Sequence, residues 1–360
     1  MASAPHILII GAGLIGLSSA DYLMRGGASV TVIDTKAGPA LGASYSNSAM
    51  IHPSQARPWL FEGDVKHAHA AFDATLELAN RSKMLLQEKL RDMGLALKDG
   101  AMAQARGCYK IYPDMTAARH AQRIYKDDGI AASVIMHNEK TLGHPALYFE
   151  DDIWSNAYAY CTALEKELRK GGALFIYEAD DLRLRQNEDG VVAALGNHVF
   201  KADHIVICAG WQSPAILAKL GLSLPLKAVK GYAVNFPRPD IKLPEAPIMD
   251  AQSHSALTVF DDHLRFSGTV DESSAKPLLR RWASLAPEIF KALSPAREIW
   301  SGLRPVSKIG RPYIGPSSIK GLWVNTGHGH MGWTLSAGSG ELIARMILDG
   351  EEDARYAYSG

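Results

Sequence analysis

Residues 6–16 read His-Ile-Leu-Ile-Ile-Gly-Ala-Gly-Leu-Ile-Gly, and this stretch decides the fold of the chain. The apolar run 7–10 predicts a fully buried strand, after which Gly11, Gly13 and Gly16 follow in G-x-G-x-x-G spacing. In such a turn the first glycine allows a tight exit from the strand, the second lets a pyrophosphate approach the backbone, and the third lets the next helix pack on the sheet. The stretch predicts a dinucleotide-binding βαβ unit; the alternative is an ordinary βαβ unit without a ligand.

The residues that follow agree with this prediction. A helix is expected over residues 14–25, ended by Gly26-Gly27, and a second strand over residues 29–33. Asp34 follows Gly16 by 18 residues, at the end of this strand, where a carboxylate can accept a hydrogen bond from a ribose hydroxyl. An acidic residue here, rather than a basic one, argues against a 2′-phosphate on the nucleotide.

The composition excludes several classes of protein. Lys plus Arg and Asp plus Glu both number 38, so the formal charge is zero and the basic excess of a nucleic-acid-binding protein is missing. Cys108, Cys161 and Cys208 are far apart, which excludes a disulfide framework and a cysteine-rich zinc site, and we expect no metal. No run approaches the ~18 apolar residues of a spanning helix. We expect a cytoplasmic protein, with peripheral attachment to the inner membrane as the alternative.

Three later segments add to the nucleotide signal. Residues 38–49 form a loop of small and polar residues that can wrap a cofactor. Residues 204–208 predict a buried parallel strand that ends at Ala209-Gly210, where the carboxyl end of a sheet leaves room for a ligand. Residues 326–333 carry glycines at the junction between a strand and a helix over 334–348, a second helix start that favours partial negative charge.

The pattern changes after residue 224. Residues 227–236 and 255–268 alternate with period two, the latter around a turn at Asp261-Asp262, which predicts antiparallel strands. Helices are expected over residues 64–93, from Ser155 or Asn156 to residue 170, and over 278–293. We therefore predict an α/β protein in which residues 1–85, 145–224 and 300–360 form a Rossmann-like nucleotide domain, while residues 86–144 and 225–299 form an inserted α+β substrate domain with an antiparallel sheet.

Six motifs together resemble a known family, the D-amino acid oxidase and glycine oxidase superfamily of FAD enzymes, and within it the bacterial D-amino acid dehydrogenase branch looks nearest. The motifs are GAGLIGLSSADYL (11–23), ASYSNSA (43–49), DHIVICAGWQS (203–213), LKAVKGYAV (226–234), GLRPVSKIGRPYIGP (302–316) and TGHGHMGWTLSAGSGELIA (326–344). The chain departs from the family in being shorter than typical dehydrogenase members and in having Asp34 where many members have Glu. Covalent members use a cysteine after the Arg-Pro motif; residues 307–318 contain none, so non-covalent FAD is expected.

The resemblance implies the residues that hold FAD. They are Gly11, Gly13, Leu14, Ile15, Gly16, Asp34, Thr35, Ala43, Ser44, Asn47, Ser48, Ala209, Gly210, Trp211, Arg304, Gly327, His328, Gly329, His330, Met331, Gly332, Trp333 and Thr334.

The resemblance also implies the reaction, an oxidative deamination of a small amino acid, of D configuration by analogy with the nearest branch. A hydride leaves Cα for the flavin, and the resulting imine hydrolyses to a 2-oxo acid. Arg304 matches the family's carboxylate-binding arginine, because a guanidinium fork binds a carboxylate bidentately. His328, His52 and Tyr232 are the other catalytic candidates, and His254 could also line the active site. A lone histidine or aromatic residue equally serves as ordinary packing. No dedicated general base is needed if the substrate enters with a neutral amine.

Several alternatives stay open. The same fold could act on a secondary amine such as D-hydroxyproline, sarcosine or an opine, as the catalytic subunit of a multi-subunit dehydrogenase. An NAD-dependent dehydrogenase and a non-catalytic FAD-binding subunit are readings of other classes, and the motifs around Arg304 and His328 count against both. The expected partners are an amino or imino acid and an electron acceptor (a quinone, a dye or oxygen), with a second subunit or a homo-oligomer as further options and no nucleic acid.

Overall fold

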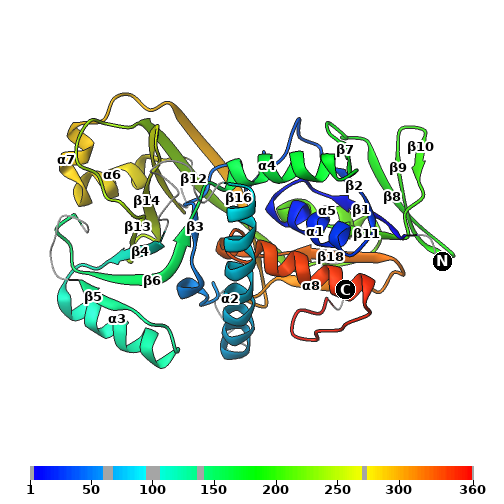
Figure 1. Ribbon diagram of the computed structural model, residues 1–360, viewed down its shortest axis with the longest axis horizontal. Helices are drawn as coiled ribbons and strands as arrows, with labels where there is room; N and C mark the ends of the chain where they lie inside the picture. Colours follow the sequence, from blue (N-terminus) through cyan, green and yellow to red (C-terminus); the bar gives the residue numbers. More distant parts are fainter. Residues whose placement is uncertain (1–3, 60–67, 95–105, 136–141, 270–273, 359–360) are drawn as a thin grey trace.

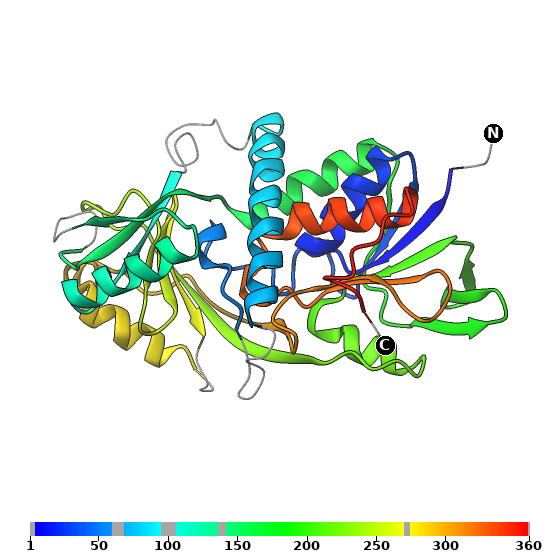
Figure 2. The ribbon, with the colours of Figure 1, turned by 90° about the horizontal axis from the view of Figure 1, so that it is seen from below.

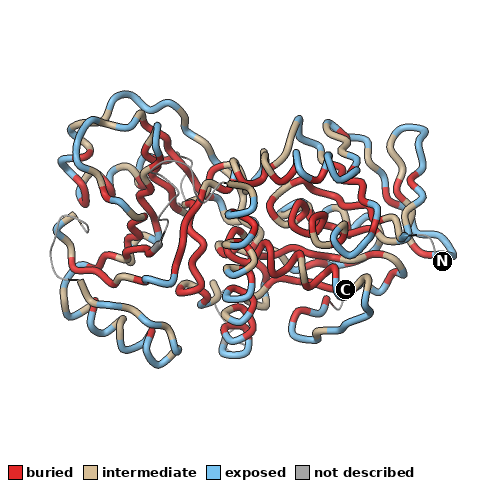
Figure 3. Tube along the Cα trace, viewed as in Figure 1, coloured by how far each residue is buried: buried red, intermediate tan, exposed pale blue. Residues whose placement is uncertain are grey.

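A computed structural model describes residues 4–59, 68–94, 106–135, 142–269 and 274–358. Two large sheets lie towards opposite ends of an elongated molecule, and the long helix α2 (Ala68–Asp92) stands between them (Figures 1 and 2). The predicted helix over residues 64–93 corresponds to α2, and residues 64–67 lie outside the described residues. Buried residues concentrate in the strands and helices around the N-terminal strand, whereas α3 (Met115–Asp127) is largely exposed (Figure 3).

The first sheet is built around the N-terminal strand. Its order is β17-β18-β11-β1-β2-β7, and all neighbours pair in parallel except the edge strand β17. The strands are β1 (His6–Ile10), β2 (Ser29–Ile33), β7 (Leu174–Ile176), β11 (His204–Ile207), β17 (Tyr313–Pro316) and β18 (Leu322–Thr326). Because β1 is apolar on both faces, it needs cover on both, which explains its continuous hydrophobic run.

Helices cover one face of this sheet, and a small sheet covers part of the other. Ile7 and Ile9 face the helical layer, whereas Leu8 and Ile10 face a cluster that includes the small antiparallel sheet. The helical layer consists of α1 (Leu14–Arg25), α4 (Ala157–Lys170) and α8 (Ser336–Leu348); the other face has α5 (Ser213–Ala218), β8 (Leu182–Asn187), β9 (Gly190–Leu195) and β10 (His198–Phe200). The predicted helix over 14–25 and strand over 29–33 are confirmed, and Asn156 caps α4 by accepting from two backbone N–H groups.

The second sheet has nine strands and is mostly antiparallel. Its order is β16-β12-β15-β14-β13-β4-β6-β3, with β5 paired to β6; the pair β13–β4 is parallel. The strands are β3 (Met50–Ile51), β4 (Arg106–Ile111), β5 (Ser133–Ile135), β6 (Ala146–Trp154), β12 (Leu226–Pro237), β13 (Ile248–Asp250), β14 (Ser255–Val259), β15 (His263–Thr269) and β16 (Glu298–Ser307). The hairpin predicted around Asp261-Asp262 is β14–β15, and the mixed α/β fold with an antiparallel sheet is confirmed.

The helix predicted over residues 278–293 is two helices, α6 (Lys276–Leu285) and α7 (Pro287–Lys291). Ala286 leaves the helical region, with φ −135° and ψ 58°, directly before Pro287. A proline disfavours helical geometry in the residue before it and lacks the N–H that would continue the ladder, whereas it fits the first turn of a new helix. The prediction of one helix was therefore wrong at this proline.

The proposed division into two domains stays a prediction. The two sheets nevertheless show which strands pair with one another. β6, which falls within the predicted nucleotide domain, pairs with β4 and β3 in the nine-stranded sheet. β16 also belongs to this sheet and leads back towards β17 of the first sheet. The two sheets are thus linked by strands near the region where the predicted site residues lie.

Candidate active site

In the glycine turn after β1, two of the three glycines are packed tightly against backbone atoms, and the third has open space beside it. A Cβ atom on Gly11 would lie 2.4 Å from the carbonyl oxygen of Cys208, and one on Gly16 would lie 1.8 Å from the carbonyl oxygen of Gly11. Gly11 has φ +113°, which L side chains rarely adopt. A Cβ on Gly13 would meet only the Oγ of Ser44, at 3.1 Å. Gly11 and Gly16 thus hold strand and helix together, while Gly13 leaves its side of the turn free for a ligand.

The start of α1 is joined to the loop and the acid that the sequence singles out. The Oγ of Ser44 accepts a hydrogen bond from the N–H of Leu14 at 3.1 Å. The carboxylate of Asp34 accepts from the N–H of Ala12 at 2.7 Å and from that of Lys36 at 2.8 Å. These bonds fix the turn, the end of β2 and the following loop around one space.

That space is a cavity of about 680 Å³. Its wall includes Asp34, which follows β2, and Gly11 and Gly13, which follow the neighbouring parallel strand β1. Leu182, Leu184, Arg304 and His330 also line it. The volume falls within the range of small-molecule and cofactor pockets. The cavity therefore adjoins the second-strand acid, the first helix start and the strand that carries Arg304.

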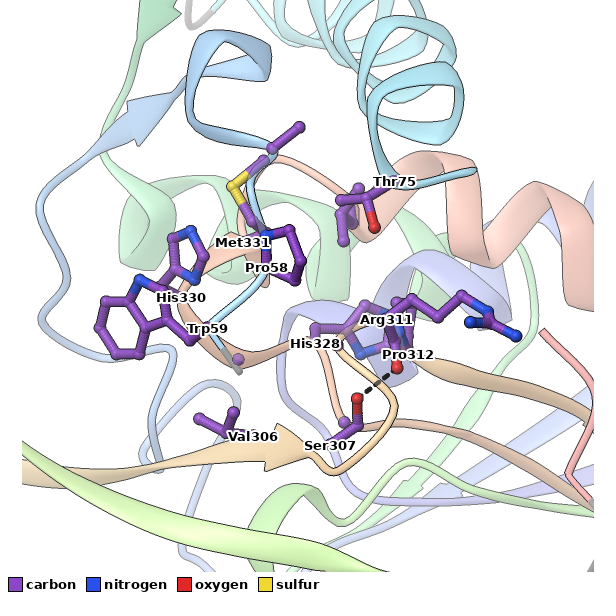
Figure 4. A pocket seen from close by; sticks show the side chains of 15 residues that line it. Pro58, Trp59, Thr75, Val306, Ser307, Arg311, Pro312, His328, His330 and Met331 are labelled. Atoms are coloured by element: carbon purple, nitrogen blue, oxygen red, sulfur yellow. Dashed lines mark hydrogen bonds between the residues drawn. The ribbon is translucent and has the colours of Figure 1, made fainter. Parts of the chain in front are cut away.

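Most of the predicted cofactor residues line this cavity. They are Gly11, Gly13, Leu14, Ile15, Asp34, Thr35, Ala43, Ser44, Asn47, Ser48, Ala209, Gly210, Trp211, Arg304, His328, Gly329, His330, Gly332 and Trp333. Gly16, Gly327, Met331 and Thr334 do not line it. Gly327 and Met331 line a second, small cavity of about 20 Å³, which His328 and His330 also border (Figure 4).

Arg304 projects from β16 towards β12 and β15. Its Nη1 donates to the Oγ1 of Thr269 at 3.0 Å, and a Cβ on Gly231 would lie 2.0 Å from that same nitrogen. Burial lowers the pKa of Arg304 to about 10, and within the described ranges no carboxylate pairs with it. A guanidinium still charged at neutral pH, desolvated and without an anion, is a ready receptor for a ligand carboxylate.

His328 is buried, with 5% of its surface exposed, and both of its ring nitrogens lack a hydrogen-bond partner among the described residues. Burial lowers its pKa to about 3, so the ring is neutral at physiological pH. A β-bridge between His328 and Val306 ties this loop to β16, close to Arg304. The ring can hydrogen-bond a ligand at the junction of the two cavities, because both cavities include it in their walls.

Two of the predicted catalytic residues lie off the cavity. His52 is buried, its backbone N–H donates to Thr334 Oγ1 at 3.0 Å, and burial lowers the pKa of its imidazole to about 3. Tyr232 lies in the hydrophobic cluster with Phe266 and Trp282, on the other face of β12 from Gly231. Because successive side chains of a strand face opposite sides, a tyrosine directly after Gly231 points away from Arg304. The structure does not bring Tyr232 to the site.

The turn that precedes α2 contacts the site through the backbone oxygen of Gln55, which lies 3.0 Å from Nε2 of His330. The 3₁₀ turn η1 (Pro53–Gln55) is held by Asp152, whose carboxyl group accepts from Ser54 N at 3.2 Å and from Ser54 Oγ at 2.5 Å. Asp152 is 2% exposed, and burial raises its pKa to about 7 even though the bonds from Ser54 lower it.

Asp152 should make stability depend on pH. Its folded-state pKa lies above the unfolded value of about 4, so its ionisation opposes folding, and the free energy of unfolding should fall by roughly 2–3 kcal/mol between about pH 5 and about pH 8. We expect Asp152→Asn to remove this fall, because the amide does not ionise, and its oxygen can accept from Ser54 N–H while its nitrogen donates to Ser54 Oγ. Urea unfolding of both proteins at the two pH values measures it, with the exposed neighbour Asp151→Asn as control. An equal pH dependence in wild type and Asp152→Asn would contradict the assignment.

The described residues fit FAD. Besides the open side of Gly13, the buried Oδ1 of Asn325 and both nitrogens of His328 lack partners in the described ranges, yet both residues line the cavity. Buried polar atoms in folded proteins are normally satisfied, so such atoms indicate a polar ligand. A nucleotide with a pyrophosphate centre and a polar ring at its far end would match the acid, the glycine turn and the histidine in that order.

Sequence reasoning missed residues that reach the cavity from outside the motifs. Leu182 and Leu184 come from β8 of the small sheet, Met50 from β3, and Lys219 from the end of α5. Only the alternation of apolar residues in 182–185 was available as a signal, and it predicts a strand without saying what the strand faces.

Across the described ranges, no three or more His, Cys, Asp or Glu side chains are grouped to hold a metal ion, and the three cysteines are buried and unpaired. None of the helices within those ranges combines the length and the apolarity that crossing a membrane requires.

The comparisons with known proteins agree with the geometry. A family model described as FAD dependent oxidoreductase (DAO) matches residues 6–346. Curated relatives include D-amino acid dehydrogenases from Azorhizobium caulinodans, 28% identical over 95% of both chains, and from Vibrio atlanticus, 28% identical over 97% of both. Among solved structures, glycine oxidase from Bacillus cereus superposes with a TM-score of 0.80 at 22% identity, covering 97% of this chain and 96% of that one. Iminodiacetate oxidase from Chelativorans gives 0.79 at 22%, covering 98% and 99%.

Proposed function

The chain belongs to the DAO family of FAD-dependent oxidoreductases, as the resemblance predicted, and we propose that within it the chain oxidises the amine of a small amino acid. The observation that carries this proposal is Arg304, a desolvated guanidinium without a carboxylate partner among the described residues, at one end of the nucleotide cavity. The family rules out the alternative of an NAD-dependent dehydrogenase.

FAD would be held non-covalently along the cavity. Asp34 would take the ribose end, the glycine turn and the start of α1 the pyrophosphate, and the loop from Gly327 to Gly332 the flavin end, with His328 and Asn325 supplying polar atoms. When bound, FAD supplies the acceptor for the two electrons and the hydrogen that leave the substrate.

The protein's own part is to bind and orient. Arg304 would hold the substrate carboxylate, and the hydrogen bond to Thr269 with the space left by Gly231 would fix the direction of its fork. The amino acid would lose a hydride from Cα and a proton from nitrogen, giving an imino acid that water hydrolyses to a 2-oxo acid and ammonia. Burial would exclude bulk water from the carboxylate contact and strengthen it.

The D configuration is a proposal supported by the names of the curated relatives, which are D-amino acid dehydrogenases. The acceptor that reoxidises FAD would be a quinone, a dye or oxygen. A secondary amine is the second candidate, since Arg304 would bind the carboxylate of sarcosine, D-hydroxyproline or an opine equally well.

Anaerobic flavin reduction tests the proposal. Purified holoenzyme is mixed without oxygen with D-alanine, L-alanine, glycine, sarcosine, D-hydroxyproline or an opine, each alone, and the visible flavin band is followed. Bleaching by a primary D-amino acid supports the proposal. Bleaching by a secondary amine alone would instead support the second candidate, oxidation of a secondary amine. A flavin band that no amine bleaches, although dithionite does, would contradict both.

A further inference from the structure

His330 occupies a defined place at the flavin end of the cavity. It lies in the 3₁₀ turn η5 (Gly329–Met331), and its ring stacks on Trp59 with centroids 4.5 Å apart and an interplanar angle of 11°. Both cavities include His330 in their walls, and Figure 4 shows it beside Trp59 at the edge of the smaller one. Arg304 lines the larger cavity as well, so the two side chains share one space.

The hydrogen bond of His330 fixes its tautomer. Its Nε2 lies 3.0 Å from the backbone oxygen of Gln55. A carbonyl oxygen only accepts, so Nε2 must carry the proton. Burial, together with the charges of Arg304, His254 and Lys110, lowers the pKa of His330 to about 4, although the hydrogen bond to Gln55 opposes this shift. The ring is therefore neutral at physiological pH, and its Nδ1 is an acceptor with a free lone pair.

The carbonyl that fixes this tautomer is itself rigidly held. The side-chain oxygen of Gln55 accepts from the ammonium of Lys110 at 2.8 Å, and the preceding Ser54 is bound by Asp152. The rings of Trp59 and His254 also lie near each other, with centroids 6.4 Å apart. Among the described residues, the one hydrogen bond of the His330 ring is that of Nε2 to Gln55, which leaves Nδ1 available to a ligand in the cavity that His330 lines.

We propose that Nδ1 of His330 accepts a hydrogen bond from the amine of the substrate whose carboxylate Arg304 holds. This inference rests on the proposed function and deepens it. A lone pair would repel a carboxylate, so His330 cannot duplicate the role of Arg304, and it selects a group that carries N–H. Arg304 would donate to the carboxylate, and His330 would accept from the amine. Together they would fix the substrate at two points and distinguish an amino acid from a simple carboxylic acid.

The test uses two ligands that lack a Cα–H and cannot be oxidised. They are 2-aminoisobutyrate and pivalate, which has a methyl group in place of the amine. Each is titrated into holoenzyme, and Kd is taken from the perturbation of the flavin spectrum. Wild type should bind the amine-bearing ligand more tightly, and His330→Leu should reduce the ratio of the two Kd values about tenfold, because a donor loses its acceptor. His330→Gln, whose amide oxygen can accept, should recover most of the ratio.

The exposed His120→Leu on α3 is the matched control and should keep the wild-type ratio. An unchanged ratio in His330→Leu would overturn the role of His330 alone, leaving the proposed function intact. Wild type that binds neither ligand would overturn the amino acid site and this inference together. Should His330→Leu lose its FAD, His330→Ala, which also lacks an acceptor, replaces it in the same comparison.

Discussion

Replacing Arg304 by Leu is expected to lower kcat/KM for the amino acid substrate by roughly 30- to 5,000-fold, corresponding to about 2–5 kcal/mol for a lost buried charge contact. Most of the loss should appear in KM, because the guanidinium holds the substrate carboxylate in the ground state as well as in the transition state. The ratio of flavin to protein absorbance should stay close to wild type. Steady-state kinetics with the substrate identified by anaerobic bleaching measures the effect.

Two further variants decide whether position or charge matters. Arg304→Lys keeps the charge but loses the bidentate fork, so it should recover only part of the loss. Gly231→Ala leaves Arg304 intact but adds a methyl group 2.0 Å from its Nη1, which must displace the fork and should raise KM in the same direction. Arg297→Leu, at an exposed arginine paired with Asp262, is the control. Wild-type kinetics in Arg304→Leu would remove its assigned role.

The nucleotide end of the site could be predicted because its signals are local. The strand, the three glycines, the helix and Asp34 all lie within residues 6–34, and Gly11, Gly13 and Asp34 line the cavity. Gly11 has a positive φ, and Gly16 packs against the backbone oxygen of Gly11, only five residues earlier. Such requirements appear in the sequence as spacing.

The substrate end could be predicted only in part, because it is assembled by strand register. Arg304 was found through a family motif, but its neighbour Gly231 is explained only by the pairing of Val229 with Arg304 across β12 and β16. The same register turns Tyr232 to the opposite face, which the aromatic character of the residue could not reveal. His330 was predicted as a cofactor contact, and its tautomer depends on Gln55, 275 residues away in sequence.

The correction to the predicted helix over residues 278–293 has a local cause. The helix over 278–293 was predicted from composition, and Pro287 divides it because the residue before a proline avoids helical geometry. By contrast, nothing in the sequence of the small sheet shows that Leu182 and Leu184 line the cavity. Local sequence patterns determine helices and strands, whereas the residues of a strand or helix that line a cavity depend on how it packs.

Gly13→Val is expected to yield folded protein without FAD. Gly13 has φ −81° and ψ −176°, an extended backbone that any residue adopts, and its Cβ would meet only Ser44 Oγ at 3.1 Å. The added side chain would project into the middle of the cavity, where the pyrophosphate would lie. Overlap of this kind should cost at least about 3 kcal/mol of binding, more than ~100-fold in the Kd for FAD. Flavin content after purification, circular dichroism and a titration with FAD measure it.

Gly16→Ala separates loss of the cofactor from loss of the fold. Its Cβ would lie 1.8 Å from the backbone oxygen of Gly11, so α1 and β1 must move apart, and both the melting temperature and FAD binding should fall. In Gly13→Val the melting temperature should instead stay close to that of wild-type apoprotein, because without FAD the new Cβ meets only the side-chain hydroxyl of Ser44, which can shift. FAD retained by Gly13→Val would show that the pyrophosphate lies elsewhere. A melting temperature lowered as far as that of Gly16→Ala would show that Gly13 serves packing, as its two neighbours in the motif do.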